Sequence, residues 1–253
     1  LKTNKSVVYI DLSSNTLGED GSIAVGNLLA SNSNIRHLKL SKVNFLDSAG
    51  VSRVNSITEG AEQNPNLESL NLSNSKLTYY DGIAVARMIG YTKSLVELDL
   101  SGNEMGDIGV EYLASDLSEN YSVAILNISN NRITDDGARA IAEWFFSNFS
   151  VVKIDLTGNN ITSKGAEEIC KGAAPNRTII QLKGIEDKGG TISKTISENL
   201  AAFKHRCSEL KSKSNITSAD PKDLFIQHQQ ILANADESFD IRTKRGLLQT
   251  LKA

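Results

Sequence analysis

One apolar pattern recurs seven times along the 253 residues and constrains the fold more than any other feature of the sequence. The pattern is apolar, two variable, apolar, one variable, apolar, and its copies begin at Val7, Ile35, Leu67, Leu95, Val123, Val151 and Ile179. Successive copies lie 28 residues apart, except for the second and third, which lie 32 residues apart. A fixed period of this length is typical of a solenoid, in which each repeat is one structural unit stacked on its neighbours.

Each repeat is predicted to contain a short strand, a turn and a helix. Repeat positions 4 and 6 are both apolar, so they point to the same side of a strand, where we expect the core. Position 9 is asparagine in four repeats, and a glycine follows six residues later, before apolar residues at helical spacing. These asparagines are Asn15, Asn103, Asn131 and Asn159. We expect their amides to satisfy backbone groups of their own turn and of the next coil.

These residues resemble the ribonuclease-inhibitor-like class of leucine-rich repeats, whose pattern is L-x-x-L-x-L-x-x-N-x-L followed by a glycine and a helix. The copy LVELDLSGNEM, which begins at Leu95, matches it at every defined position except the last, where Met105 takes the place of leucine. The resemblance covers residues 1–188 and implies an α/β horseshoe, with parallel strands on the concave side and helices outside. The class includes an enzyme inhibitor, innate-immune sensors, activators of a nuclear-transport GTPase and effectors that bacteria inject into host cells. It therefore implies a protein-binding role.

Both ends of the chain depart from the repeat. Residues 1–6 are typical of the end of a repeat helix, so we expect the chain to begin inside a preceding repeat. Apolar residues at spacings of three and four predict a helix over 189–211 that caps the solenoid. An aspartate before Pro221 then indicates a new helix start. Residues 212–253 are predicted to form a helical appendix, or to belong to a further domain.

The composition argues against several classes of protein. With 40% hydrophobic residues and a net charge of −3, the chain has neither the composition of a disordered protein nor a general basic field for nucleic acid. Two cysteines cannot stabilise a chain of this size by disulfides, which favours a reducing, intracellular location. No apolar run reaches the length that a membrane-spanning helix needs.

The sequence offers little material for catalysis. Its three histidines are dispersed, and Cys170 and Cys207 occupy helical positions where a buried thiol is expected. Phosphate-binding loops and metal-binding motifs are lacking. We therefore expect no enzyme activity, metal or cofactor within these residues.

Eight N-x-S/T sequons allow two interpretations. They indicate either a glycosylated, secreted protein or an accident of a chain rich in asparagine and serine, and we favour the accident.

The predicted binding surface lies on the strand side, where repeat positions 3 and 5 point away from the core. Position 5 is Asp or Asn in five repeats and position 7 is Ser or Thr in six, which is typical of hydrogen bonding within the repeat. The second repeat deviates most, through its basic residues and an enlarged loop at 43–66. We predict a partner-binding surface composed of Tyr9, Arg36, His37, Lys39 and Lys42, with Glu97 and Asp99 as an acidic counter-patch and Lys153 on the same face. The alternative is a solvated surface with no partner.

The sequence thus predicts a non-catalytic scaffold that binds an unidentified protein partner. The favoured setting is a secreted bacterial effector in the host cytoplasm, because strands rich in Asn, Ser and Lys and a divergent helical tail suit an injected protein. A regulator of GTPases is the first alternative. The second is the substrate-recognition arm of an enzyme whose catalytic domain lies outside residues 1–253.

Overall fold

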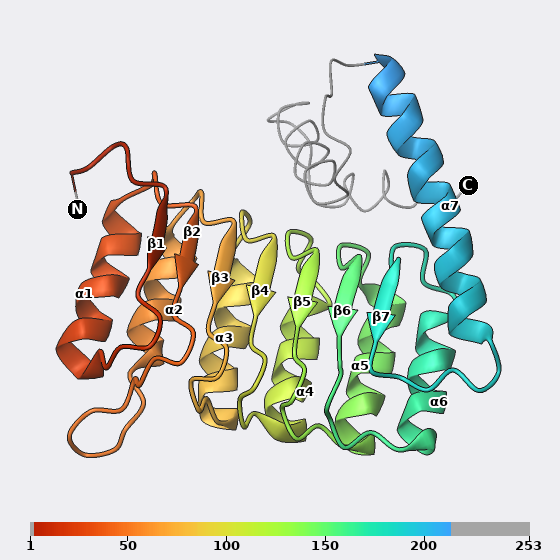
Figure 1. Ribbon diagram of the computed structural model, residues 1–253, viewed down its shortest axis with the longest axis horizontal. Coiled ribbons are helices and arrows are strands. Elements are labelled where there is room, and N and C mark those ends of the chain that lie inside the picture. The colour runs from red at the N-terminus through yellow and green to blue at the C-terminus, as the bar shows by residue number, and fades with distance from the viewer. Residues whose placement is uncertain (1–2, 214–253) are drawn as a thin grey trace.

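The computed structural model describes residues 3–213 and shows a two-layered solenoid (Figure 1). One parallel sheet contains β1 (Tyr9–Asp11), β2 (His37–Lys39), β3 (Ser69–Asn71), β4 (Glu97–Asp99), β5 (Ile125–Asn127), β6 (Lys153–Asp155) and β7 (Gln181–Lys183), in chain order. The helices are α1 (Gly18–Ser31), α2 (Val54–Gln63), α3 (Tyr79–Tyr91), α4 (Gly106–Leu117), α5 (Asp135–Ser147), α6 (Ser163–Ala173) and α7 (Thr191–Lys213).

The strand register reproduces the sequence repeat. Tyr9 pairs with His37 and His37 with Ser69, and so on to Gln181, so that every strand consists of repeat positions 3 to 5. Equivalent positions of adjacent repeats therefore lie side by side across the sheet. This arrangement confirms the predicted α/β leucine-rich-repeat solenoid, with strands and helices in separate layers.

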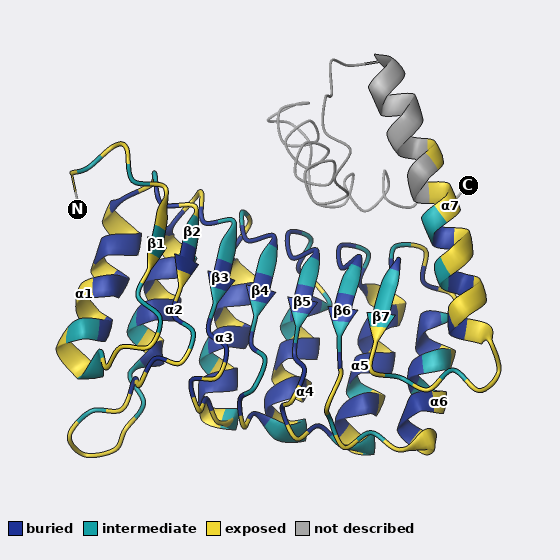
Figure 2. Cartoon of the chain, viewed as in Figure 1, coloured by how far each residue is buried: buried dark blue, intermediate teal, exposed yellow. Residues whose placement is uncertain are grey.

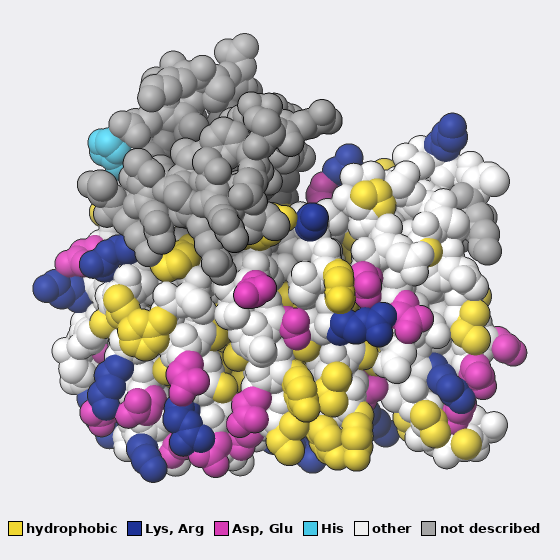
Figure 3. Space-filling view, turned by 180° about the vertical axis from the view of Figure 1, so that it is seen from behind, with side chains coloured by type: hydrophobic (Ala, Val, Ile, Leu, Met, Phe, Trp, Pro, Cys, Tyr) yellow, Lys and Arg dark blue, Asp and Glu magenta, His cyan; other side chains and the backbone are white. Residues whose placement is uncertain are grey.

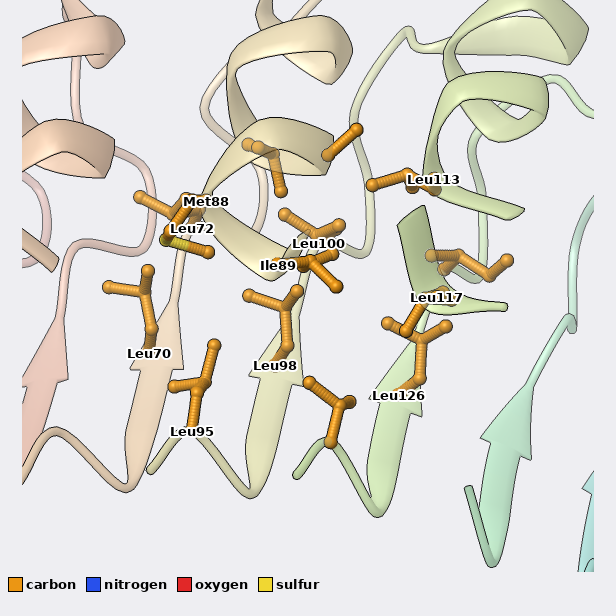
Figure 4. Close-up of a cluster of buried hydrophobic side chains, with 14 of the residues drawn as sticks. Leu70, Leu72, Met88, Ile89, Leu95, Leu98, Leu100, Leu113, Leu117 and Leu126 are labelled. Carbon is orange, nitrogen blue, oxygen red and sulfur yellow. The ribbon is translucent and has the colours of Figure 1, made fainter. Parts of the chain in front are cut away.

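The core consists of two rows of aliphatic side chains on the inner side of the sheet. From the second to the sixth repeat, position 4 (Leu38, Leu70, Leu98, Leu126, Ile154) and position 6 (Leu40, Leu72, Leu100, Ile128, Leu156) are almost fully buried (Figure 2). Figure 4 shows Leu70, Leu98 and Leu126 directed alike from successive strands, with Met88, Leu113 and Leu117 from the helices around them. Burial of one such side chain contributes about 1.5–3 kcal/mol, and each row is buried only because its neighbours are present.

Three of the four position 9 asparagines hydrogen bond to the preceding coil. Asn103 Nδ2 donates to the carbonyls of Leu100 (2.8 Å) and Leu72 (3.0 Å), the second of which belongs to the coil before. Its Oδ1 accepts from the amides of Ser75 (2.9 Å) and Leu77 (3.1 Å) of that same coil. The prediction that the position 9 asparagines bond to the next coil is therefore wrong. The turn at position 9 lies against the preceding repeat instead.

The Nδ2 atoms of Asn131 and Asn159 likewise donate to the preceding coil, at the carbonyls of Leu100 and Ile128. Asn159 Oδ1 also accepts from the amides of Asn131 and Ile133. Asn15 instead bonds within its own turn, to the carbonyls of Leu12 and Ser13, and is exposed. Four asparagines with one sequence position thus have two different environments.

A second row of asparagines, which was not predicted, lies three residues before six of the seven repeat starts, with Thr92 at the equivalent place before the fourth. Asn148 is a typical member, 2% exposed, and its Nδ2 donates to the carbonyls of Leu117 (2.8 Å) and Asn120 (3.2 Å) in the preceding coil. Its Oδ1 accepts from the amides of Ser150 and Val151. Equivalent bonds to the preceding coil are made by Asn32, Asn64, Asn120 and Asn176.

This second row accounts for several of the sequons. Asn120, Asn148 and Asn176 each begin an N-x-S/T sequence and are buried. Their Oδ1 atoms accept from the amide of the Ser or Thr two residues later, which is an Asx turn. The three sequons are therefore products of turn chemistry that the repeat copies. The sequon at Asn215 lies outside the described residues.

Aspartates in the first turn of one helix cap the next helix. Asp135 of α5 accepts from Thr162 Oγ1 (2.7 Å), the Thr162 amide (2.8 Å) and the Gly165 amide (3.1 Å) at the start of α6. A Cβ atom on Gly165 would lie 2.4 Å from Asp135 Oδ1, which explains why this position is glycine. Asp107 binds Thr134 and Gly137 at the start of α5 in the same way.

The first turns of α7 pack on the last coil. Ile192 and Asn199 are buried, and Asn199 Nδ2 donates to the carbonyls of Asn176 (3.0 Å) and Ile179 (2.9 Å). The helix starts and ends within two residues of the capping helix predicted over 189–211. Residues 214–253, and with them nearly all of the predicted appendix, lie outside the described residues. Within the described part of the chain, no helix has the length and apolar content needed to cross a bilayer.

We predict that Asn103→Ala lowers the free energy of unfolding by about 3 kcal/mol, because it leaves buried amides and carbonyls without partners. Denaturant unfolding monitored by circular dichroism measures this loss. The matched control is Asn15→Ala, which removes the same side chain from an exposed turn and should cost less than about 1 kcal/mol. Equal losses in the two variants would show that the bonds between coils are not what stabilises the stack.

A second prediction concerns pH. The hydrogen bonds from Thr162, first from its hydroxyl and then from its amide, hold the pKa of Asp135 below its ordinary value of 3.8. Its capping contribution is therefore complete above that value and is lost as the pH falls through the lower pKa of the folded state. Asp135→Ala should lower the Tm at pH 7, and the difference from the unsubstituted chain should close at strongly acidic pH.

Thermal unfolding across pH 2–7 tests this expectation. The control is Asp136→Ala, since Asp136 is exposed on the same helix and its carboxylate forms an ion pair with Arg139 (3.4 Å). A Tm difference for Asp135→Ala that does not change with pH would contradict the capping role of the charge.

Candidate protein-binding surface

Three of the predicted residues form one cluster at the β1–β2 end of the sheet. Tyr9 and His37 are register partners at position 3, and their ring centroids lie 6.4 Å apart. Lys39 Nζ lies 5.6 Å from the centroid of the Tyr9 ring, in cation–π geometry. The Tyr9 side chain is 49% exposed. We call Tyr9, His37 and Lys39 the aromatic cluster.

Groups within and around the aromatic cluster shift the pKa values of Lys39 and Asp11 in the directions that favour their ionised forms. The Tyr9 hydroxyl, and behind it the carboxylates of Asp11 and Glu97, raise the pKa of Lys39. Hydrogen bonds from Ser13, and then from the Tyr9 hydroxyl (3.4 Å), lower the pKa of Asp11. At neutral pH the cluster therefore presents a cation and an aromatic ring beside a fixed carboxylate.

Arg36 and Lys42 lie at the two ends of β2 instead of on its outward face. Arg36 precedes the strand and forms an ion pair with Glu68 of the next coil. Lys42 follows the strand in a left-handed turn, with φ of 57°, where the fourth and sixth repeats have Gly102 and Gly158. Both predicted residues thus flank the aromatic cluster without joining it.

Glu97, Asp99 and Lys153 are gathered in a separate place, a shallow hollow over β4–β7. The hollow has a volume of about 200 Å³ and is also lined by Ile125, Gln181 and Lys183, which were not predicted as site residues. Asp99 accepts from Asn71 Nδ2 (3.1 Å), and Glu97 accepts from Ser69 Oγ (3.3 Å). The acidic patch and Lys153 therefore do not meet the aromatic cluster in one site.

Most position 5 carboxyl and amide groups take part in the repeat's own hydrogen bonding. The Oδ1 atom of each such residue accepts from the amide two residues later, as between Asp99 and Ser101 (3.0 Å) or Asp155 and Thr157 (3.0 Å). Lys39 and Lys183 are the two side chains at position 5 that cannot make this bond. Lys39 instead lies over the Tyr9 ring, and Lys183 forms an ion pair with Asp155 (3.5 Å).

Hydrogen bonds to Asp47 connect the two sides of the enlarged loop of the second repeat. Asp47 accepts from the amides of Ala49 (2.8 Å) and Val51 (2.9 Å) and from Arg53 Nε (2.9 Å). These bonds, that from Val51 first, lower the pKa of Asp47. Leu46 and Val51 are nevertheless exposed at the surface of the loop. The loop is therefore cross-linked by hydrogen bonds to Asp47 while it exposes apolar side chains to solvent.

The helix side has an apolar surface that sequence patterns did not reveal. Tyr80 and Ile83 on α3 and Ile108 and Tyr112 on α4 are exposed. Figure 3, which views the molecule from behind, shows hydrophobic side chains gathered on that face. Helical spacing predicts which residues face the core, but not which outward positions are apolar.

The described residues contain no group of three or more His, Cys, Asp or Glu side chains placed to hold a metal ion. Cys170 is a free, half-buried thiol, and burial raises its pKa. Cys207 has no described side chain, and His228 lies outside the described residues.

A family model described as Leucine Rich repeat matches four segments, residues 63–86, 93–114, 120–142 and 147–170. In the solved structure of the leiomodin-1 actin-binding site 2, 93% of the chain superposes on 62% of this one with a TM-score of 0.55 and 22% sequence identity. That likeness concerns the fold.

Two curated relatives come from Dictyostelium discoideum. The Rho GTPase-activating protein gacW is 29% identical over 119 residues, which are 45% of this chain and 11% of that protein. Protein CARMIL is 33% identical over 128 residues, which are 47% of this chain and 12% of that protein. The matched region is thus a small part of each relative.

We predict that Asp47→Ala mobilises the enlarged loop without unfolding the repeats, because it removes the acceptor for two loop amides and for Arg53. Hydrogen exchange at the Ala49 and Val51 amides should accelerate about tenfold or more. Ser48→Ala, on the neighbouring residue, is the control and should leave both exchange rates unchanged. Unchanged exchange in Asp47→Ala would mean that the loop is held by other contacts.

Proposed function

Because this chain is a leucine-rich-repeat protein, we propose that it is a non-catalytic scaffold whose strand face binds a protein partner. The observation that carries the proposal is the aromatic cluster of Tyr9, His37 and Lys39. Tyrosine is one of the residue types that dominate protein interfaces, and a cation beside it adds electrostatic selectivity.

The strands under the cluster favour binding further. Tyr9 and His37 extend from adjacent strands of a hydrogen-bonded sheet in fixed register. A surface that is already ordered loses little conformational entropy when a partner docks. We therefore regard the cluster as the centre of the interface, with Arg36 and Lys42 at its rim.

We keep an intracellular location as part of the proposal, since Cys170 is a free thiol. The bacterial-effector setting remains a prediction from composition, and both curated relatives reported above come from Dictyostelium discoideum.

A second candidate function, regulation of a GTPase, is favoured by the name of one relative, the Rho GTPase-activating protein gacW. The likeness covers 11% of that protein. We therefore propose that in this case the repeats would recognise a GTPase or its complex, with GTP hydrolysis promoted elsewhere. A binding assay with Rho-type GTPases separates the two functions, since a scaffold for another partner does not bind them.

The proposed interface is tested by Tyr9→Ala combined with Lys39→Glu. A photo-crosslinking amino acid at residue 37 identifies a partner in eukaryotic cell lysate, and the purified partner is then titrated against each variant. Removal of one central anchor costs about 2 kcal/mol or more, so the double variant should weaken binding by about 30-fold or more.

The matched control is Tyr112→Ala combined with Lys164→Glu, which changes the same residue types on the exposed surface of the helix layer. It should leave the affinity within about twofold. A partner that binds the first double variant as tightly as the unsubstituted chain, or that is lost in the control, would place the interface elsewhere.

A further inference from the structure

We propose that the hollow over β4–β7 binds one face of a helix of a partner protein. That face carries a basic and an acidic side chain seven residues apart, with an apolar side chain between them. The inference rests on the proposed function and assigns a partner chemistry to a part of the strand face away from the aromatic cluster. It follows from the order of side chains across the strands.

Position 3 changes from acid to apolar to base across three adjacent strands. The register pairs Glu97 with Ile125, and Ile125 with Lys153. Neighbouring strands lie about 4.8 Å apart, so the acidic and basic positions are separated by about 9.6 Å. Other strands do not present this order, since position 3 is Tyr9, His37 and Ser69 in β1–β3.

That spacing matches a helix better than an extended chain. Residues seven apart on one helix face are separated by about 10.5 Å along the axis, with the residues at i+3 and i+4 between them. An extended chain places residues of one face about 6.7 or 13 Å apart, which fits the three positions poorly. A helix lying across the strands therefore contacts Glu97, Ile125 and Lys153 together.

The two charged ends of the hollow differ in sign. Glu97 and Asp99 lie at positions 3 and 5 of the same strand, so a basic side chain placed there meets two carboxylates. At the other end, Lys183 pairs with Asp155 (3.5 Å). Among the described residues, Lys153 has no carboxylate within ion-pairing distance, so it is available for an acidic side chain of the partner.

The apolar residue at the centre of the hollow packs against buried side chains. Ile125 is half-buried and packs against the buried row of Val96, Ala124, Val152 and Ile180. Its side chain is therefore fixed in position while part of it faces the hollow. An apolar residue of the partner helix that covers Ile125 removes the exposed part from water.

The test is a selection from a library of displayed helices, with seven variable surface positions on a rigid helical scaffold, against the full chain. Enriched sequences should carry a basic and an acidic residue seven positions apart, in either chain direction, with an apolar residue three or four positions from one of them. Against Lys153→Glu, the acidic residue should be replaced by a basic one. Against Ile125→Asp, the apolar preference should disappear.

The control is Lys164→Glu, which makes the same charge change on α6 and should leave the selected pattern as it is. The most enriched helix, synthesised as a peptide, should bind Lys153→Glu about tenfold more weakly than the unsubstituted chain, because an ion pair becomes a like-charge contact. Circular dichroism of each variant shows that it is folded.

Failure of this inference is distinguishable from failure of the proposed function. Selected helices that lose binding in Tyr9→Ala but not in Lys153→Glu would overturn the assignment of the hollow and leave strand-face binding intact. Helices that bind every variant equally, or no enrichment over the Ile125→Asp chain, would also overturn it. Helices that bind every variant equally, Tyr9→Ala included, would also remove the support for binding at the strand face.

Discussion

Buried backbone groups between adjacent coils must find hydrogen-bond partners, and asparagine side chains supply them at both turns of the repeat. Asn103 satisfies four backbone groups, one of its own coil and three of the coil before it. Asn148 satisfies four at the other turn, two of its own coil and two of the coil before it. Aliphatic rows alone would tolerate small shifts between coils, since apolar contacts have no direction. Directional bonds at both turns fix each coil on its neighbour.

Fixed stacking is what gives the strand face a reproducible pattern. Each coil places its position 3 and position 5 side chains beside those of the next, so the surface is ordered by the sequence of repeats. Tyr9 stands beside His37 at one end, and Glu97 beside Ile125 and then Lys153 further along. Deviations from the repeat are therefore brought together without any change in the backbone, which leaves the surface free to vary while the stack is conserved in shape.

The periodic parts of this structure follow from the sequence, and the local contacts between coils do not. Strand positions and the rows at positions 4 and 6 were predictable because alternation and period fix which side chains face inward. The direction of the asparagine bonds was not, since a period shows that neighbours exist but not which of them a turn lies against. Arg36 and Lys42 are exposed, but they lie beyond the two ends of β2, because turn geometry that the period does not reveal sets their places. The asparagines three residues before the repeat starts could have been found from the sequence, because they recur with the period of the repeat in all but one place, where Thr92 replaces asparagine.

The way α7 joins the last coil sets a limit on how such an array can change in length. Asn199 donates to the carbonyls of Asn176 and Ile179, and the Asn176 carbonyl is the group that the asparagine of an additional coil would otherwise use, just as Asn176 itself donates to the Asn148 carbonyl. A repeat added directly after β7 would compete with α7 for the Asn176 carbonyl. A repeat duplicated between two existing coils would instead meet the same donors and acceptors on both sides. Copy number in this architecture can thus grow from within, by internal duplication, while the terminating helix keeps its place.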